Sequence, residues 1–339
     1  MSETSWLPFG LTEPNPQLVR ERLRQRAQLV QRIRQFFQNR DVVEVDTPAL
    51  SQYGVSDLHV HNWCAFAPSA TQANSASSLP PLKYLQTSPE YAMKRLLAAG
   101  SGDIYQLARV FRDDPSGRHH NPEFTLLEWY RIGYNMRQLM TEVDEFLQAM
   151  LNCQPAQQVS YQALFEQYLQ VDPLADVSGK QLRDRLREIA HVAELAAQET
   201  NPTTLQQLAM ALVIEPELAN GPPTLVFNFP VAQAALARAD AEDARVANRF
   251  ELYYRGIELA NGFAELTDAD EQARRFAEDN QARQAHDLVP MAADKRLLQA
   301  LAAGLPTCAG VALGIDRLLL LALGLDHIQA VQTFNSANA

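Results

Sequence analysis

Apolar side chains recur every three or four residues near the start of the chain, from Pro16 to about Asn39. This spacing is typical of an amphipathic helix. Asparagine is a good helix cap and proline fits the first turn, so Asn15 and Pro16 predict where the helix begins. The residues before it, 1–15, are expected to form an extended N-terminal tail.

Alternating apolar and polar positions predict strands in two groups, separated by a mostly helical stretch at 137–216. The first group is expected at 42–45, 84–86, 104–111 and 123–131, and the second at 224–229, 249–266 (two strands with a turn at Arg255-Gly256) and 307–313. Further helices are expected at 90–99, 269–286 and 315–323, and an exposed loop at 67–81, which is rich in Ala, Ser and Pro. Strands near both ends with helices between them favour an α+β fold with an antiparallel sheet over alternating βαβ units.

Charge and composition narrow the possible functions. The chain has 339 residues and a formal net charge of −11, which is unfavourable for generic nucleic-acid binding because such binding relies on Lys and Arg. No apolar run approaches the ~20 residues of a membrane span, so no membrane association is expected. The three cysteines are far apart and odd in number, which suits a reducing cytoplasm rather than a disulfide framework.

The first of three unusually polar segments is the turn between the strands expected at 104–111 and 123–131. It contains Arg112, Arg118, His119 and His120, and Phe124 opens the next strand. Such a turn can gather cationic donors around a polyphosphate, and an aromatic ring beside it can stack on a base. The alternative is a solvated hairpin tip that binds nothing.

The second segment, 256–266, carries Glu258 and Glu265, seven residues apart. On an uninterrupted strand this odd separation would point the two side chains to opposite faces. A bulge or bend at Asn261-Gly262 is predicted to return both carboxylates to one side. Two carboxylates that face phosphates indicate Mg²⁺ between them. Two exposed glutamates flanking a turn are the alternative.

The third segment, 310–319, is predicted to be a buried strand that enters a helix, with Asp316 and Arg317 at the junction. A helix N-terminus favours anions, so Arg317 could reach a terminal phosphate from there. The alternative is an ordinary surface arginine beside a capping aspartate. The sequence contains neither a P-loop nor a dinucleotide-binding glycine fingerprint, so a nucleotide would need a different kind of site.

Together and in this order, the three segments resemble motifs 2 and 3 of the class II aminoacyl-tRNA synthetases. The Asp-Thr-Pro sequence at 46–48, after the long helix, is similar to motif 1, the dimer motif. The stretches 87–90, 120–124, 258–263 and 314–317 resemble the lysyl branch most closely. The resemblance implies a class II synthetase-like catalytic domain at 16–325, with 137–216 as a mostly helical insertion and 326–339 as a C-terminal tail.

A lysyl-tRNA synthetase carries an N-terminal OB-fold domain that reads the anticodon, and a first helix near residue 16 leaves no room for one. A free-standing domain of this kind resembles the elongation factor P β-lysine ligase family. That resemblance implies activation of (R)-β-lysine with ATP and transfer to a lysine of elongation factor P. It also implies Mg²⁺ as cofactor and a homodimer formed through motif 1, with no tRNA substrate.

The resemblance implies roles for individual residues as well. Arg112 would bind the α-phosphate and Arg317 would lie near the γ-phosphate, and these two are the expected catalytic residues. Further ATP contacts are expected from Asp113, Asp114, His120, Asn121, Phe124, Glu258, Leu259 and Gly314. Glu258 and Glu265 would hold Mg²⁺, and the amino-acid substrate would be bound by Ser88, Glu90, Tyr130, Glu265 and Ala312.

Two positions matter for how closely the family pattern applies. Motif 2 usually reads Arg-x-Glu, whereas Asp114 is one methylene shorter, so its contact with the adenine amino group could be lost or bridged by water. Ala312 stands where lysyl-tRNA synthetases commonly have glycine. Its methyl group is expected to disfavour α-lysine relative to β-lysine, and a small core residue without substrate contact is the alternative.

Three other functions fit parts of the pattern. They are a truncated lysyl-tRNA synthetase-like enzyme acting on tRNA, an asparagine-synthetase-like enzyme that amidates a small molecule, and a catalytically inactive regulatory paralogue. Retention of both arginines and both glutamates speaks against the last. Pyrophosphate exchange with α-lysine and β-lysine, followed by transfer to tRNA or to elongation factor P, separates the others.

Overall fold

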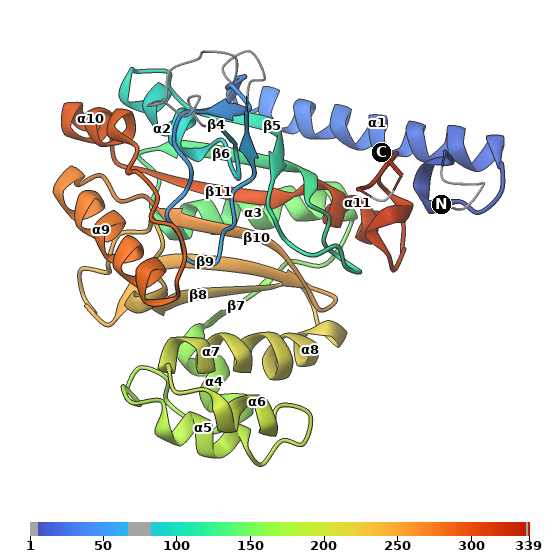
Figure 1. The fold of residues 1–339 in the computed structure, drawn as a ribbon. Helices are drawn as coiled ribbons and strands as arrows, with labels where there is room; N and C mark the ends of the chain where they lie inside the picture. Colours follow the sequence, from blue (N-terminus) through green and yellow to red (C-terminus); the bar gives the residue numbers. More distant parts are fainter. Residues whose placement is uncertain (1–5, 67–82, 337) are drawn as a thin grey trace, which may run out of the picture. The chain divides into compact units, whose positions relative to one another are not determined.

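The computed structural model describes residues 6–66, 83–336 and 338–339. The loop expected at 67–81 therefore lies outside the described residues. The chain folds into two compact units, whose elements are labelled in Figure 1. Unit 1 comprises Met1–Ile132, Thr267–Thr307 and Ala312–Ala339, and unit 2 comprises Gly133–Leu266 and Cys308–Val311.

Unit 1 combines a long N-terminal helix with a sheet. Its helices are α1 (Pro16–Gln38), α2 (Glu90–Ala98), α9 (Ala269–Ala285), α10 (Lys295–Gly304) and α11 (Ile315–Ala322), with 3-10 turns η1 (Pro8–Gly10) and η6 (Ile328–Ala330). Its main sheet runs in the order β1 (Val43–Glu44), β5 (Ile104–Phe111), β6 (Glu123–Ile132) and the last residues of β11 (Cys308–Gly314). A small second sheet has the order β2 (Leu50–Ser51), β4 (Lys83–Leu85) and β3 (Cys64–Ala65).

The antiparallel hairpin of β5 and β6 gives unit 1 two unlike faces. One face packs on α1, where the ring of Phe37 stacks on Tyr105 with centroids 4.3 Å apart and meets Trp129 at 5.4 Å. Because side chains alternate along a strand, the other face of β6 carries Phe124 and Tyr130. The apolar contacts with α1 thus leave the second face available for the predicted site.

Unit 2 joins a group of helices to the other half of the strands. Its helices are α3 (Met136–Leu151), α4 (Tyr161–Leu169), α5 (Lys180–Leu186), α6 (Ala193–Gln198), α7 (Pro202–Ala209) and α8 (Glu215–Glu217), with a π-helical turn η3 (Met210–Ile214) and 3-10 turns η4 (Leu218–Asn220) and η5 (Val231–Gln233). The first residues of β11 are followed in the sheet by β10 (Ile257–Ala264), β9 (Val246–Tyr254), β8 (Thr224–Pro230) and β7 (Gln157–Ser160). Within this unit, Figure 1 shows α4 to α8 gathered beside β7 and β8.

One buried apolar cluster holds the helices of unit 2 to its strands. Tyr161 and Phe165 of α4 stack on each other, and Tyr161 also meets the ring of Phe229 on β8. Val226 and Tyr253 extend the same cluster onto β8 and β9. Burial of such large side chains contributes about 1.5–3 kcal/mol each, so this cluster accounts for the attachment of α4 to the strands.

The α+β fold predicted from the sequence is confirmed, and most elements fall within a few residues of their predicted bounds. Asn15 caps α1 as predicted, since its side chain accepts from the backbone N–H of Leu18 at 3.0 Å. The helix α10, the strand β7 and the short strands β2 and β3 were not predicted from the sequence. The strand β7 lies in the stretch expected to be mostly helical, and it forms by parallel pairing with β8, which is a long-range contact without a local signal. In the described parts of the chain, no helix is long and apolar enough to cross a membrane.

The two ends of the described chain are packed rather than extended. The expectation of an extended tail is wrong for Pro8–Gly10, which form a 3-10 turn with Phe9 buried. The backbone N–H of Phe9 donates to the carbonyl of Thr333 at 2.9 Å, and Ile328 and Val331 are buried nearby in the sequence. Apolar side chains at both ends therefore join the core of unit 1.

Candidate functional site

Arg112 and Phe124, predicted to contact the nucleotide, come together at the open end of the β5–β6 hairpin. Arg112 directly follows β5, and its backbone N–H donates to the carbonyl of Pro122 at 2.9 Å. Its guanidinium donates to the carbonyl of Thr87 at 3.3 Å and lies 5.3 Å from the centre of the Phe124 ring. A cation and a ring face so close together suit a phosphate and a base of one nucleotide.

A second cationic group in unit 1 surrounds Arg317, in the first turn of α11. Its Nε donates to the carbonyl of His119 at 3.2 Å, and a terminal nitrogen lies 2.8 Å from Nε2 of His120. Burial, together with the nearby cations Arg118 and Arg317, lowers the pKa of His119 below its ordinary value. The helix N-terminus adds partial positive charge, so this turn is suited to an anion.

Asp316, next to Arg317, has a structural role in unit 1. Its side chain is buried, and it accepts from the backbone N–H of Thr125 at 2.8 Å and from Arg26 of α1 at 2.6 Å. It is not the helix cap, since the N-cap position is Gly314 and no side chain caps it. The buried carboxylate thus fixes the start of α11 against β6 and, with it, the place of Arg317.

Ser88, Glu90 and Tyr130, which are predicted to bind the amino-acid substrate, are linked through a carboxylate that was not predicted from the sequence. Glu128 of β6 is buried, and its two oxygens accept from Ser88 at 2.7 Å and from Tyr130 at 2.5 Å. Ser88 in turn accepts from the backbone N–H of Glu90 at 3.0 Å. The signal for Glu128 was present, because it lies two residues before Tyr130 on a strand where every second residue shares a face.

A buried lysine supports Glu90 from the next turn of α2. Lys94 is only 2% exposed, and its Nζ donates to Glu90 at 2.7 Å. Buried lysines are rare unless they are paired, so this ion pair fixes the direction of the Glu90 carboxylate. The spacing of four residues on a helix is a signal that the sequence reading did not use.

The remaining predicted contacts in the motif 2 turn differ in exposure. Asn121 is 7% exposed; its amide nitrogen donates to the carbonyl of Glu123 at 2.6 Å and its oxygen accepts from Ser336. Asp113 is exposed and Asp114 is half-buried. The Asn121 side chain is thus engaged within the protein. The roles of Asn121, Asp113 and Asp114 at a nucleotide stay predictions.

Ala312 lies on the same face of the sheet as Phe124, which is predicted to contact the nucleotide. Its half-buried side chain packs, together with Phe124, against a small cluster of Ala108, Val110 and Leu126. The methyl group therefore has packing contacts of its own, and its predicted influence on the substrate would come in addition to them.

In unit 2, a bulge brings the two predicted metal-binding glutamates to one side. Along the pairing of β10 with β9, the register shifts between Glu258 and Ala260, so Leu259 is the extra residue. One inserted residue reverses the alternation of side chains, and Glu258 and Glu265 then fall on the same side. Glu265 is 2% exposed and follows the end of β10.

The predicted position of that bulge, at Asn261-Gly262, is wrong. Asn261 and Gly262 pair in regular register with Glu251 and Phe250. Glycine is needed there for packing instead, because a Cβ atom at Gly262 would lie 2.4 Å from the Phe250 ring and 3.0 Å from Cβ of Val311. The dipeptide therefore signals a close approach of side chains rather than a turn.

A polar network on β9 interacts electrostatically with Glu258. Arg249 pairs with Glu251, which also accepts a short hydrogen bond from Tyr253. The guanidinium of Arg249 further donates to the carbonyl of Gln233 at 2.6 Å and to Asn261 of β10 at 3.2 Å. Burial raises the pKa of the Glu251 carboxyl above its ordinary value. These side chains were not singled out from the sequence.

Comparison with known proteins shows the family to which this chain belongs. The tRNA synthetases of class II (D, K and N) match residues 12–338. The chain belongs to this family. An elongation factor P–(R)-β-lysine ligase from Haemophilus ducreyi is 49% identical over 319 residues, which is 94% of each chain. Proteins of the same name from Salmonella paratyphi B and Salmonella dublin are each 48% identical over 337 residues, or 98% of each chain.

Membership of the class II synthetase family implies the use of ATP. The carboxylates of unit 2 offer oxygen donors of the type that the predicted Mg²⁺ would need. Mg²⁺ prefers carboxylates and usually takes one or two of them together with waters and substrate phosphates. Within the described ranges, no three or more His, Cys, Asp or Glu side chains gather into a metal-binding group. Glu258 and Glu265 as metal-binding residues stay a prediction.

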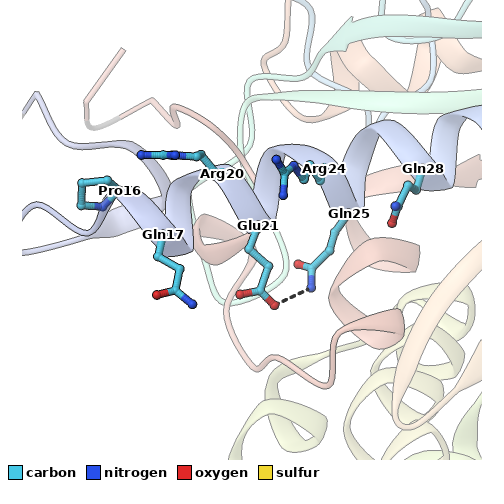
Figure 2. Close-up of a pocket in the computed structure, with 7 residues that line it drawn as sticks. All are labelled: Pro16, Gln17, Arg20, Glu21, Arg24, Gln25 and Gln28. Carbon is cyan, nitrogen blue, oxygen red and sulfur yellow. Dashed lines mark hydrogen bonds between the residues drawn. The ribbon is translucent and has the colours of Figure 1, made fainter.

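A shallow groove along α1 contains none of the predicted site residues. Figure 2 shows the side chains that line it, which all come from one stretch of the helix: Pro16, Gln17, Arg20, Glu21, Arg24, Gln25 and Gln28. The lining is mostly polar, and Gln25 donates to Glu21 at 3.1 Å. The groove thus belongs to the helix that precedes motif 1.

Proposed function

We propose that this chain activates (R)-β-lysine with ATP and transfers the β-lysyl group to a lysine side chain of elongation factor P. The observation that carries the proposal is the near full-length identity of 48–49% to proteins named for this activity. The cationic groups and the buried carboxylates described above supply the chemistry that the reaction needs.

In the first step, a carboxylate oxygen of the substrate attacks the α-phosphorus of ATP. A carboxyl–phosphorus bond forms, the bond to the bridging oxygen breaks, and pyrophosphate leaves. Arg112 and Arg317 stabilise the negative charge that develops on the phosphates, and they hold the chain of phosphates in line with the attacking oxygen. This step depends on charge and alignment rather than on an acid or base.

In the second step, the amine of the acceptor lysine attacks the carbonyl carbon of the adenylate. A new amide bond forms, AMP leaves, and the proton of the amine passes to solvent or to the released AMP. The substrate's own ammonium groups find their counter-charges in unit 1 at Glu90 and Glu128, whose directions are fixed by Lys94, Ser88 and Tyr130. Glu265 is a further anionic partner in the proposal.

Glu258 and Glu265 would hold Mg²⁺ in this proposal. When bound, the ion neutralises phosphate charge and supports the departure of pyrophosphate. The neighbouring Arg249–Glu251 pair keeps a buried counter-charge beside Glu258, which allows several carboxylates to stand close together on β9 and β10.

The homodimer expected through motif 1 belongs to the proposal too. Unit 1 exposes apolar side chains that support it: Leu23 on α1, Val43 on the edge strand β1 and Leu50 on β2. Light scattering of the purified chain is expected to give twice the monomer mass, and charged substitutions at Val43 and Leu50 are expected to give monomers. A wild-type monomer at all concentrations would remove the dimer from the proposal.

The function is tested in two stages. Pyrophosphate exchange with ATP is measured first with (R)-β-lysine and α-lysine, where β-lysine is expected to be preferred. The enzyme is then mixed with elongation factor P and with tRNA, and mass spectrometry follows one modified lysine on the factor. An unmodified factor beside charged tRNA would favour the lysyl-tRNA synthetase-like alternative. A cytoplasmic location, where both ATP and the factor are present, completes the proposal.

A further inference from the structure

The C-terminal segment of unit 1 runs along the turn that carries Arg112 and His120. We define this segment, 326–336, as the C-terminal strap, and residues 112–122 as the motif 2 loop. The backbone N–H of Ile328 donates to the carbonyl of Arg118 at 2.9 Å, and the Arg118 side chain donates to the carbonyl of Asp326 at 2.9 Å and to its carboxylate at 3.1 Å.

The far end of the strap is fastened to the same loop through Ser336. Its backbone N–H donates to the Asn121 side-chain oxygen at 3.2 Å, and its hydroxyl donates to the same oxygen at 3.0 Å. The Ser336 hydroxyl also shares a hydrogen bond of 3.0 Å with the hydroxyl of Ser116. Just beyond the loop, Gln332 donates to the carbonyl of Glu123 at 3.2 Å.

The strap is itself held by the core of unit 1. Ile328 and Val331 are buried, as are the polar side chains of Gln332 and Asn335. The backbone N–H of Phe9 donates to the carbonyl of Thr333, so the N-terminal 3-10 turn is hydrogen-bonded to the strap. A segment with buried apolar anchors and several hydrogen bonds to one loop restrains that loop more than an exposed tail would.

The motif 2 loop is therefore fixed from two directions. Arg317 of α11 holds the carbonyl of His119 and contacts the ring of His120, and the strap holds Ser116, Arg118 and Asn121. The same loop carries Arg112 and His120, which are expected to meet the phosphates. A site that binds a charged ligand gains affinity when its loop is already ordered before binding, since less entropy is then lost.

We infer that the C-terminal strap positions the motif 2 loop for ATP, with Ser336 as a positioning residue that acts through Asn121. This inference rests on the proposed function, because it assigns the loop to the phosphates of ATP. It predicts a specific kinetic signature. Loosening the strap raises the KM for ATP and leaves the KM for (R)-β-lysine and the kcat close to their wild-type values.

The test compares Ser336→Ala, the conservative variant Ser336→Thr and a truncation after Thr333, which keeps the buried anchors Ile328 and Val331. A neutral hydrogen bond is worth a factor of about two to ten, so Ser336→Ala is expected to raise the ATP KM about two- to tenfold, and the truncation more. Ser336→Thr should restore the wild-type value. Ser101→Ala, which removes an exposed serine hydroxyl that donates to the neighbouring Gly102 carbonyl, is the matched control.

Hydrogen exchange of the backbone amides gives a second readout that needs no activity. In Ser336→Ala and in the truncated protein, exchange is expected to rise within 112–122 and to stay unchanged in β5, β6 and α11. If no lysine isomer is activated by the wild type, the proposed function fails, while faster exchange in the loop still shows the restraint. Wild-type exchange in the loop, or equal rises in the KM for ATP and for β-lysine, would overturn the inference.

Discussion

The cationic residues of unit 1 and the carboxylates of unit 2 are held in opposite ways. Arg112 and Arg317 are half-buried and follow the ends of β5 and β11, and their guanidinium groups rest on the backbone carbonyls of Thr87 and His119. Glu265 is almost fully buried, and Glu258 lies on a strand beside the buried Arg249–Glu251 pair.

The difference follows from the cost of burying charge. A guanidinium has several donors, so one or two carbonyls can orient it while its other donors stay available to a ligand. A carboxylate has only acceptor oxygens. When it is buried, a nearby cation must balance its charge, because it otherwise takes up a proton. We therefore expect substitution of the two arginines of unit 1 to affect chemistry alone, and substitution of the two glutamates of unit 2 to affect both metal binding and stability.

The largest effect is expected at the two arginines. Arg112→Ala and Arg317→Ala should each lower the rate of pyrophosphate exchange about 10²–10³-fold, since each removes a donor aimed at developing charge. Thermal unfolding should change little, because neither guanidinium is buried. The matched control is Arg109→Ala, an exposed arginine on β5 whose partner Glu123 is 3.7 Å away. Normal exchange in a folded Arg112 or Arg317 variant would remove that arginine from the mechanism.

Removing one carboxylate tests the other side of the comparison. Loss of even an outer partner of a metal typically weakens its binding about 10–100-fold. Glu258→Gln is therefore expected to raise the Mg²⁺ concentration at half-maximal exchange by about tenfold or more. Glu242→Gln, at an exposed position of unit 2, should leave it unchanged. Full wild-type activity in EDTA would contradict a role for Mg²⁺ altogether.

Sequence reasoning succeeded where the signal is local and failed where contacts are distant. The N-cap of α1 and the alternation in β5 and β6 predicted those elements, and the polar segments identified Arg112 and Phe124, which the structure brings together. The sequence reading missed Lys94 and Glu128, although helical and strand spacing connect them to Glu90 and Tyr130. The bonds from Ser336 to Asn121 span more than two hundred residues, and no local pattern announces them.

The close packing around Gly262 on β10 gives the next prediction, which concerns stability in unit 2. Gly262→Ala would place a methyl group against Phe250 and Val311, and overpacking of this kind costs about 1–3 kcal/mol of unfolding free energy. Denaturant or thermal unfolding measures it. Gly221→Ala is the matched control, because its Cβ would meet only the Leu218 carbonyl at 4.0 Å and its φ is −99°. Equal stability of both variants would show that β10 can shift to accommodate the methyl group.

The smallest effect is expected at Ala312, on β11, the strand that contributes residues to both units. A single methyl group near the substrate is worth about 1–3 kcal/mol of discrimination, so Ala312→Gly should improve the use of α-lysine relative to (R)-β-lysine by about tenfold or somewhat more. The ratio of the two pyrophosphate exchange rates measures it. The methyl group also packs against Ala108, Val110 and Leu126, and a glycine in a strand costs about 0.5–1 kcal/mol by itself. Ala108→Gly separates the two causes, because it loosens the same cluster from β5. If both variants change stability alike but only Ala312→Gly changes the ratio, the methyl group acts on the substrate. An unchanged ratio would leave Ala312 as packing and move the selectivity to the residues around Glu90 and Glu128.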